Sequence, residues 1–162
     1  VNLSRREADL AVTVSPPRTG RLTVQKITDY RLHLATHRDH ADLADPGALP
    51  VVGYIPDMIF DAELDYLGAL GLDRVARASN SVSVQLQMLR QGGTVGIVHD
   101  FALPFAPELV RVLTDRVSLK RAFYLVRHAA DRRSDRLNRL SAALVAGLRA
   151  EVARLEAAVR DA

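Results

Sequence analysis

Cysteine is absent from this 162-residue chain, and its absence excludes disulfides, thiolate zinc sites and cysteine nucleophiles. Long apolar runs are absent as well. None approaches the ~18 residues that a membrane-spanning helix needs, so we expect no membrane insertion. The first residues do not follow the basic, apolar and small-residue order of a secretory signal. We therefore expect a cytoplasmic protein.

Lysine is scarce: two of the 22 basic residues are lysine, and the others are arginine, which stays protonated in proteins. The net charge is only +3, although the isoelectric point is about 9.7. Residues 39–73 hold eight acids and no lysine or arginine, whereas residues 115–139 hold eight basic residues and three acids. This polarised distribution favours lobe packing, self-association or simple solvation over a basic surface that binds nucleic acid.

The length fits about one ordinary domain or two small lobes, and 48% hydrophobic residues are enough for a core. Alternating apolar residues predict strands, and leucines three or four positions apart predict helices. We expect strands at 9–15, 22–27, 30–36, 51–55, 74–78, 94–99, 109–113 and 121–126, and helices at 61–72, 81–90 and over the last ~25 residues. This alternation indicates an α/β fold with a parallel or mixed sheet.

Three motifs resemble ligand sites but lack the required context. The glycines at 92, 93 and 96 follow a predicted helix, whereas a nucleotide-binding loop precedes one. His37 and His40 lie in a polar loop without a third ligand on a rigid element, which argues against zinc. An EF-hand starting at Asp61 would need glycine where the chain has Tyr66. We expect neither a metal nor a cofactor.

The chain also lacks the G-x-S-x-G and S-x-x-K motifs of common serine nucleophiles. No pair of carboxylates stands in a context that would push their pKa values apart. His99 and Asp100, at the end of a predicted strand, are the residues that most suggest acid–base chemistry, and an enzyme that uses them stays an alternative. We expect a protein that is not an enzyme.

Small polar and aromatic residues gather where the predicted strands end. In open α/β sheets, ligands bind beyond the carboxyl ends of strands. The helix expected at 81–90 begins at one such end, and the free backbone amides from Ser81 to Ser83 are suited to a carboxylate. We therefore predict a small-ligand cleft at these strand ends. Its candidate residues are Thr13, Ser15, Thr36, Tyr54, Asn80, Ser81, His99, Asp100 and Phe101.

The order of these segments resembles the C-terminal effector-binding domain of LysR-type transcriptional regulators. Residues 6–12 are similar to the family's G-x-x-D-(L/I)-A strand entry, and residues 50–52 to its (L/Y)-P-(L/V)-(I/V) strand. The strand at 32–36 runs into residues 37–40, where members carry an H-P-L segment. Residues 80–98 resemble the family's polar cap, helix and G-x-G-(V/I)-(G/A)-(I/L)-(L/V)-P block, with His99 and Asp100 replacing the usual ending.

The resemblance implies a two-lobe fold similar to type-2 periplasmic binding proteins, in which each lobe is a mixed sheet flanked by helices. Lobe I would comprise residues 1–37 and 121–162, without the family's first strand and helix, and lobe II residues 38–120. The crossover strands would be 32–36 and 123–127. Effector contacts map onto Thr36, Tyr54, Asn80, Ser81 and residues 99–101, with Thr13 and Ser15 as further candidates from lobe I.

In function, the resemblance implies a sensor that binds a small effector, an organic or aromatic acid, between the lobes and switches an oligomer on DNA. The family implies a homodimer or homotetramer. Promoter DNA would be contacted only by an N-terminal winged helix-turn-helix, which we do not find in this sequence. The alternative is a solute-binding receptor of the same fold without a role at DNA.

Overall fold

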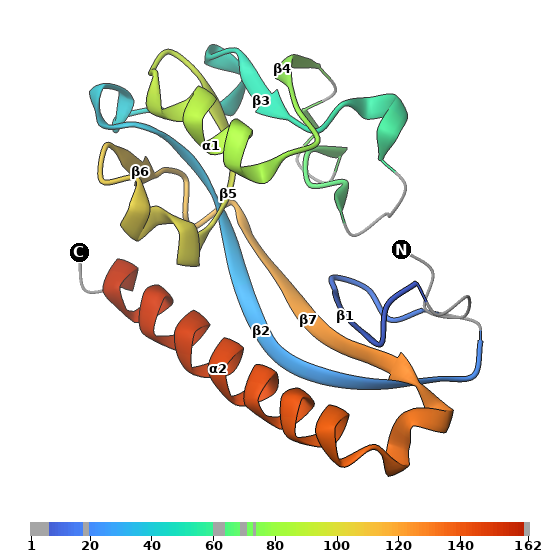
Figure 1. Ribbon diagram of the computed structural model, residues 1–162. Helices are drawn as coiled ribbons and strands as arrows, with labels where there is room; N and C mark the ends of the chain where they lie inside the picture. The colour runs from blue at the N-terminus through green and yellow to red at the C-terminus, as the bar shows by residue number, and fades with distance from the viewer. Residues whose placement is uncertain (1–6, 18–19, 60–63, 69–70, 73, 161–162) are drawn as a thin grey trace.

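The computed structural model describes residues 7–17, 20–59, 64–68, 71–72 and 74–160 (Figure 1). The two long strands in it are β2 (Leu22–His37) and β7 (Ser118–His128). The shorter strands are β1 (Leu10–Thr13), β3 (Val51–Gly53), β4 (Val75–Ala78), β5 (Val95–His99) and β6 (Leu109–Arg111). The α-helices are α1 (Val82–Arg90) and α2 (Asp135–Arg160). A six-residue 3-10 helix, η7 (Asp100–Phe105), follows β5 directly.

The strands form one mixed sheet in the order β1-β7-β2-β5-β3-β4, with β6 paired to the end of β2. Pairing is parallel only between β3 and its two neighbours, β4 and β5, and antiparallel elsewhere. The predicted mixed α/β sheet is therefore confirmed. β2 and β7 run from the part of the molecule that contains β3, β4 and α1 to the part that contains β1 and most of α2 (Figure 1).

The sequence predicted two strands, at 22–27 and 30–36, where the structure has the single strand β2. The register against β7 shifts between Lys26 and Thr28, which leaves Ile27 as an extra residue in a bulge. A bulge bends a strand without ending it. Because Arg149 of α2 donates from Nε and Nη2 to the Ile27 carbonyl, at 3.0 and 2.9 Å, the polar group at the bulge is satisfied.

The predicted helix at 81–90 is confirmed as α1. Its N-cap is Ser81, whose side-chain oxygen accepts a hydrogen bond from the Val84 amide, and its first helical residue is Val82. Gly92 and Gly93 follow with φ angles of 80° and 63°, a conformation that glycine adopts without a steric penalty, so they end the helix.

The helix predicted at 61–72 is wrong over its described residues, 64–68 and 71–72, because none of them is in an α-helix: Leu64 and Gly68 are in 3-10 conformation and the others are irregular or in turns. Leu64, Tyr66 and Leu67 all pack against the core or line a cavity, and this close spacing does not fit one face of an α-helix. Gly71, with φ of 65°, supports a turn in which the Leu72 amide donates to the Leu67 carbonyl. The rest of the predicted helix lies outside the described residues.

The long C-terminal helix is confirmed as the 26-residue α2. Its buried face contributes Val145 to a core cluster with Ile27 and Leu125. Glu156 accepts a hydrogen bond from the backbone amide of Arg31 at 2.7 Å. This bond and the Arg149 bonds to Ile27 hold α2 along β2 at two levels.

Candidate ligand-binding site

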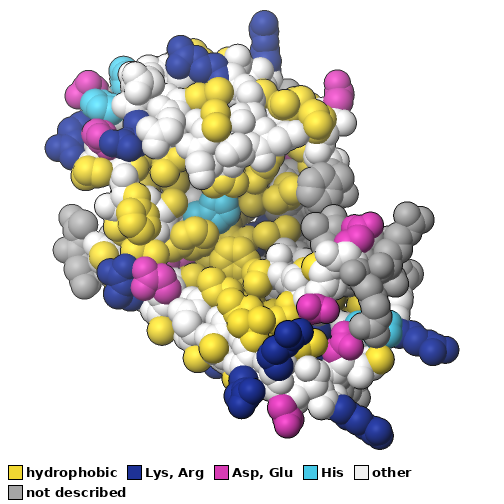
Figure 2. Space-filling view, in the orientation of Figure 1, with side chains coloured by type: hydrophobic (Ala, Val, Ile, Leu, Met, Phe, Trp, Pro, Cys, Tyr) yellow, Lys and Arg dark blue, Asp and Glu magenta, His cyan; other side chains and the backbone are white. Residues whose placement is uncertain are grey.

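Rings from five separate segments converge where β2 and β7 pass the end of β5. Leu32 in β2 lies opposite His99 on one side and Leu119 on the other, so the three strands are side by side at this level. Figure 2 shows a hollow across the middle of this face, with hydrophobic side chains and a histidine on its floor. Six rings form what we call the aromatic cluster: Tyr30, Tyr54, Tyr66, His99, Phe101 and Phe123.

Tyr30, from the middle of β2, is the centre of this cluster and is only 1% exposed. Its ring stacks on Phe123 with centroids 4.4 Å apart, and it lies 5.4 Å from His99 and 5.6 Å from Phe101. Tyr66 meets His99 edge-on at 6.3 Å and continues to Tyr54 at 5.9 Å. Nearly all of these distances lie in the range that aromatic pairs favour, so the rings form one contiguous apolar surface.

His99 contributes an imidazole to the cluster beside the three tyrosine hydroxyls, and it is 7% exposed. Its Nδ1 atom has no hydrogen-bond partner among the described residues. Burial among rings disfavours the charged imidazolium and lowers the pKa of His99 to about 4, although the negative charge of Asp100 acts in the opposite direction. At neutral pH the cluster therefore contains an uncharged imidazole with unused hydrogen-bonding capacity.

Asp100 follows His99 directly but belongs to a different set of contacts. Its carboxylate binds His33 Nδ1 at 2.8 Å and Arg111 Nη1 at 3.3 Å, and it is 3% exposed. Arg111 also donates to the carbonyl of Val159 near the end of α2, at 3.0 Å. The predicted alternative of an enzyme that uses His99 and Asp100 as an acid–base pair is therefore not supported, since the carboxylate is bound to another histidine.

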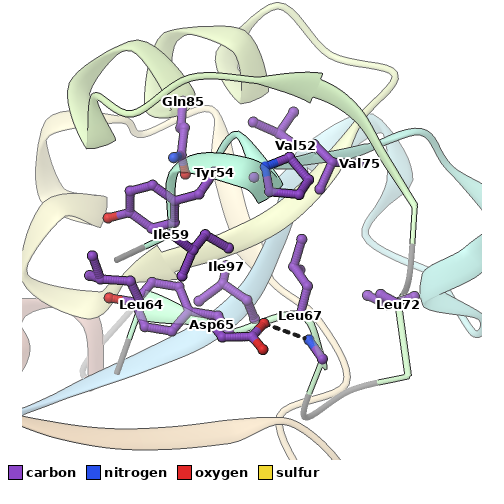
Figure 3. Close-up of a pocket in the computed structure, with 14 residues that line it drawn as sticks. Val52, Tyr54, Ile59, Leu64, Asp65, Leu67, Leu72, Val75, Gln85 and Ile97 are labelled. Carbon is purple, nitrogen blue, oxygen red and sulfur yellow. Dashed lines mark hydrogen bonds between the residues drawn. The ribbon is translucent and has the colours of Figure 1, made fainter. Parts of the chain in front are cut away.

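A cavity of about 200 Å³ adjoins the cluster on the side of β3 and β4 (Figure 3). Tyr54, Tyr66 and Ile97 line it together with the Gln85 side chain of α1. Asp65 also borders the cavity, where its carboxylate accepts a hydrogen bond from the Gly68 amide at 3.1 Å. Burial raises the pKa values of Tyr54 and Tyr66, so both phenols stay protonated at neutral pH.

Asn80 and Ser81, two of the predicted site residues, lie beside this cavity but serve the local backbone. The Asn80 side chain accepts from the Ile55 amide at 3.4 Å and donates to Met58 Sδ at 3.2 Å. Ser81 caps α1, and the Gln85 amide group donates to the Ser79 carbonyl at 2.6 Å. Both residues thus have hydrogen-bond partners within the chain, and their contact with a ligand stays a prediction.

The remaining predicted residues lie apart from the cluster. Thr36 is fully buried in β2, and its hydroxyl donates to the Thr94 carbonyl at 2.8 Å. In β1, Thr13 donates to the Ser15 carbonyl at 2.8 Å. The structure therefore brings together His99, Phe101 and Tyr54, and it gives Thr36 and Thr13 intramolecular partners.

Sequence reasoning missed Tyr30, Tyr66 and Phe123, which supply half of the rings. Tyr66 was considered only as a residue that excludes a calcium loop, and its segment was expected to be helical. Tyr30 and Phe123 begin or flank predicted strands, where an aromatic residue is ordinary. The signal that would have identified them was their scarcity, since the whole chain contains four tyrosines and four phenylalanines.

Arg121 of β7 lies opposite Tyr30 in the register, and its positive charge acts on the Tyr66 hydroxyl. In the described part of the chain, no group of three His, Asp or Glu side chains is suited to hold a metal ion. Over the same residues, no helix is long and apolar enough to cross a membrane.

Comparison with known proteins gives a consistent result. The family model of the LysR substrate binding domain matches residues 2–149. The regulatory domain of CrgA, a LysR-type transcriptional regulator from Neisseria meningitidis, superposes with a TM-score of 0.75 at 16% identity, over 91% of this chain and 79% of that one. The regulatory domain of MetR, a LysR family regulator from N. meningitidis, gives 0.66 at 17%, over 92% and 75%.

Full-length LysG from Corynebacterium glutamicum, with bound effector Arg, gives a TM-score of 0.63 at 24% identity over 88% of this chain. The match covers 52% of LysG, so this chain corresponds to about half of that regulator. No curated protein sequence matches the chain. Since the family model covers most of the chain, the chain belongs to the LysR substrate binding domain family of transcriptional regulators and has the two-lobe α/β fold of type-2 periplasmic binding proteins.

Proposed function

We propose that this domain is the effector sensor of a LysR-type regulator and binds a small organic or aromatic acid between its lobes. The observation that carries the proposal is the aromatic cluster with His99 Nδ1, for which the described residues supply no hydrogen-bond partner. A buried polar atom without a partner is unfavourable in the empty domain and gains a hydrogen bond when a suitable ligand arrives. Native proteins contain few buried polar atoms without a hydrogen-bond partner, and a functional role is one reason for such an atom to be present.

The lobes in this proposal are residues 1–37 with 121–162, and residues 38–120. The cluster draws on both: Tyr30 and Phe123 come from lobe I, whereas Tyr54, Tyr66, His99 and Phe101 come from lobe II. A ligand that contacts both sets favours one relative orientation of the lobes. The ligand can increase the population of that orientation only to the extent that it binds this orientation more tightly than the alternative one.

Switching at DNA is the finer part of the proposal. We infer that a homodimer or homotetramer of the complete regulator contacts promoter DNA through a separate winged helix-turn-helix and that lobe closure changes the arrangement of its subunits. The similarity to LysR-type regulators supports this role. No observation favours the alternative of a solute-binding receptor.

The first test is a thermal-unfolding screen of small organic acids against the 162-residue chain. A ligand at about 100 times its Kd adds about 2.7 kcal/mol to the free energy of unfolding, which raises Tm by a few degrees. The key variant is Phe101→Ala, which removes a ring of the cluster. Its control is Phe105→Ala, four residues further along the same 3-10 helix, because Phe105 is 64% exposed.

The proposal predicts a ligand-induced rise in Tm that Phe101→Ala abolishes and Phe105→Ala preserves. If both variants kept the ligand-induced rise in Tm, the ligand would bind elsewhere than in the cluster, and the assigned site would be refuted. If no organic acid raised Tm in this chain or in the complete regulator, the sensor role itself would be wrong.

A further inference from the structure

The aromatic cluster contains a large share of all the rings in this chain. Aromatic residues make up only 5% of the sequence, as four tyrosines and four phenylalanines. Five of these eight residues belong to the cluster, and they come from segments between Tyr30 and Phe123 in the sequence. Tyr30 and Tyr66 are buried in the core, whereas Tyr54, Phe101 and Phe123 are partly exposed. The three partly exposed rings offer flat, polarisable faces against which the ring of a ligand packs well. The composition of the site therefore favours an aromatic ligand over an aliphatic one.

The polar requirement of the site is specific. His99 Nδ1 has no partner among the described residues, and the imidazole is neutral at physiological pH. A neutral imidazole donates from one ring nitrogen and accepts at the other. A hydroxyl group both donates and accepts, so it is complementary to Nδ1 in either tautomer. A carboxylate only accepts, and an ammonium group only donates.

The electrostatic requirement lies at the edge of the cluster. The side chain of Arg121 places a positive charge near the Tyr66 hydroxyl, and the register sets Arg121 opposite Tyr30. Lys26 and Lys120 line a separate surface groove together with Arg121, and both bind the Asp29 carboxylate there, at 2.6 and 3.1 Å. The nearest buried acid, Asp100, is held by His33 and Arg111. A negatively charged ligand group is therefore favoured on the Arg121 side.

We propose that the effector of this domain is a hydroxylated aromatic acid, whose ring packs in the aromatic cluster, whose hydroxyl binds His99 Nδ1 and whose carboxylate faces Arg121. This inference rests on the proposed function and adds to it the chemical class of the ligand. In this proposal, His99 recognises the hydroxyl of the ligand, and Arg121 makes the domain prefer an acid over its neutral analogue.

The test is calorimetric titration of the 162-residue chain with matched probes. The three positional isomers of hydroxybenzoate are compared with benzoate, which lacks the hydroxyl, with the corresponding hydroxybenzamide, which lacks the charge, and with cyclohexanecarboxylate, which lacks the aromatic ring. At least one hydroxybenzoate should bind about 3- to 10-fold more tightly than benzoate, the difference expected for one neutral hydrogen bond. The hydroxybenzamide and cyclohexanecarboxylate should both bind more weakly than that isomer.

Two variants assign the contacts. His99→Phe keeps a ring in place but has no nitrogen, so hydroxybenzoate and benzoate should bind it equally. Because this variant also removes a buried unpartnered polar atom, its own Tm should equal or exceed that of the wild type, which separates lost recognition from lost folding. The Arg121→Gln variant should still bind hydroxybenzoate more tightly than benzoate, but it should bind hydroxybenzoate and hydroxybenzamide with equal affinity.

Each failure identifies which proposal is wrong. If another organic acid bound in a manner that required Phe101 while no hydroxybenzoate bound, the ligand class would be refuted and the sensor role would stand. If hydroxybenzoate binding kept its hydroxyl preference in His99→Phe, the role of His99 would be refuted. If no compound of either set bound the chain or the complete regulator, both proposals would fail.

Discussion

His99 and Asp100 are neighbours in the sequence, both buried, and opposite in how their polar atoms are used. Asp100 has a partner for each carboxylate oxygen, His33 on one and Arg111 on the other. His99 Nδ1 has no partner among the described residues and is surrounded by rings. Since burial of polar groups is unfavourable without compensation, the first arrangement stabilises the domain and the second lowers its stability. The contacts of Asp100 therefore serve the fold, whereas the ligand site proposed above depends on the unused nitrogen of His99.

The largest effect should follow from Asp100→Ala. Truncation leaves His33 and Arg111 without their shared carboxylate and removes the link from η7 through Arg111 to the end of α2. Breaking a buried ion pair in this way costs about 3–5 kcal/mol, which urea unfolding would measure. Asp115→Ala, at an exposed aspartate in the loop before β7, is the control and should change stability little. A loss below about 1 kcal/mol for Asp100→Ala would remove the contrast between the two residues.

The next effect is the pH dependence of stability that His99 produces. The pKa of His99 is about 4 in the folded chain, whereas an unfolded histidine has a value near 6.5. As the pH falls from 6.5 to 4, the unfolded state takes up a proton that the folded state does not, so the free energy of unfolding decreases. Above pH 6.5 this loss is absent. A separation of this size corresponds to a loss of roughly 3 kcal/mol at the acidic end of the window.

Urea unfolding of the wild type and His99→Phe at several pH values would isolate this contribution, because the carboxylates titrate in both proteins. The wild type should lose stability more steeply than His99→Phe between pH 6.5 and 4. Parallel curves would show that His99 has an ordinary pKa and is not enclosed by the rings as the structure describes.

Sequence reasoning succeeded where one short segment determines the structure. Ser81 caps α1, the glycines after Gln91 end it, and the leucine spacing of 137–159 forms α2. It failed at 61–72, where Leu64 and Leu67 have helical spacing but the described residues are not α-helical and bring Tyr66 into the core. Tertiary packing overrides a weak helical pattern of this kind.

The site was predictable only in part, because its geometry depends on strand pairing. His99 and Phe101 were found from their place at a strand end. The bulge at Ile27 shifts the register of β2 by one residue and so determines which β2 side chains share a face with Phe123. The contact of Asp100 with His33 depends on the antiparallel pairing of β2 with β5. Neither register can be derived from the alternation within a single strand.

A smaller effect is expected from Arg111→Met, which keeps most of the apolar stem and removes the guanidinium. The variant loses the bonds to Asp100 and to the Val159 carbonyl, while Asp100 keeps His33. We expect a loss of about 1.5–3 kcal/mol, the usual value for a hydrogen bond to a charged group. Amide hydrogen exchange should accelerate in the last turns of α2 and stay unchanged near its start. Arg116→Met is the control, since Arg116 is exposed and donates to the Ala44 carbonyl at 3.3 Å.

The smallest effect, from Ser81→Ala, tests whether a polar group that already has a partner also serves the ligand. As an N-cap, Ser81 should contribute about 1 kcal/mol to stability, measured by urea unfolding. The variant should lose that amount and keep the full ligand-induced rise in Tm, because its side chain is used by the Val84 amide. If the Ser81 side chain contacts the effector, as the sequence predicts, the variant should instead show a smaller ligand-induced rise in Tm, in addition to its lower free energy of unfolding. That result would mean that Ser81 can give up its hydrogen bond with the Val84 amide in order to bind the ligand. The absence of a described partner for His99 Nδ1 would then no longer set His99 apart from other polar residues as a ligand contact.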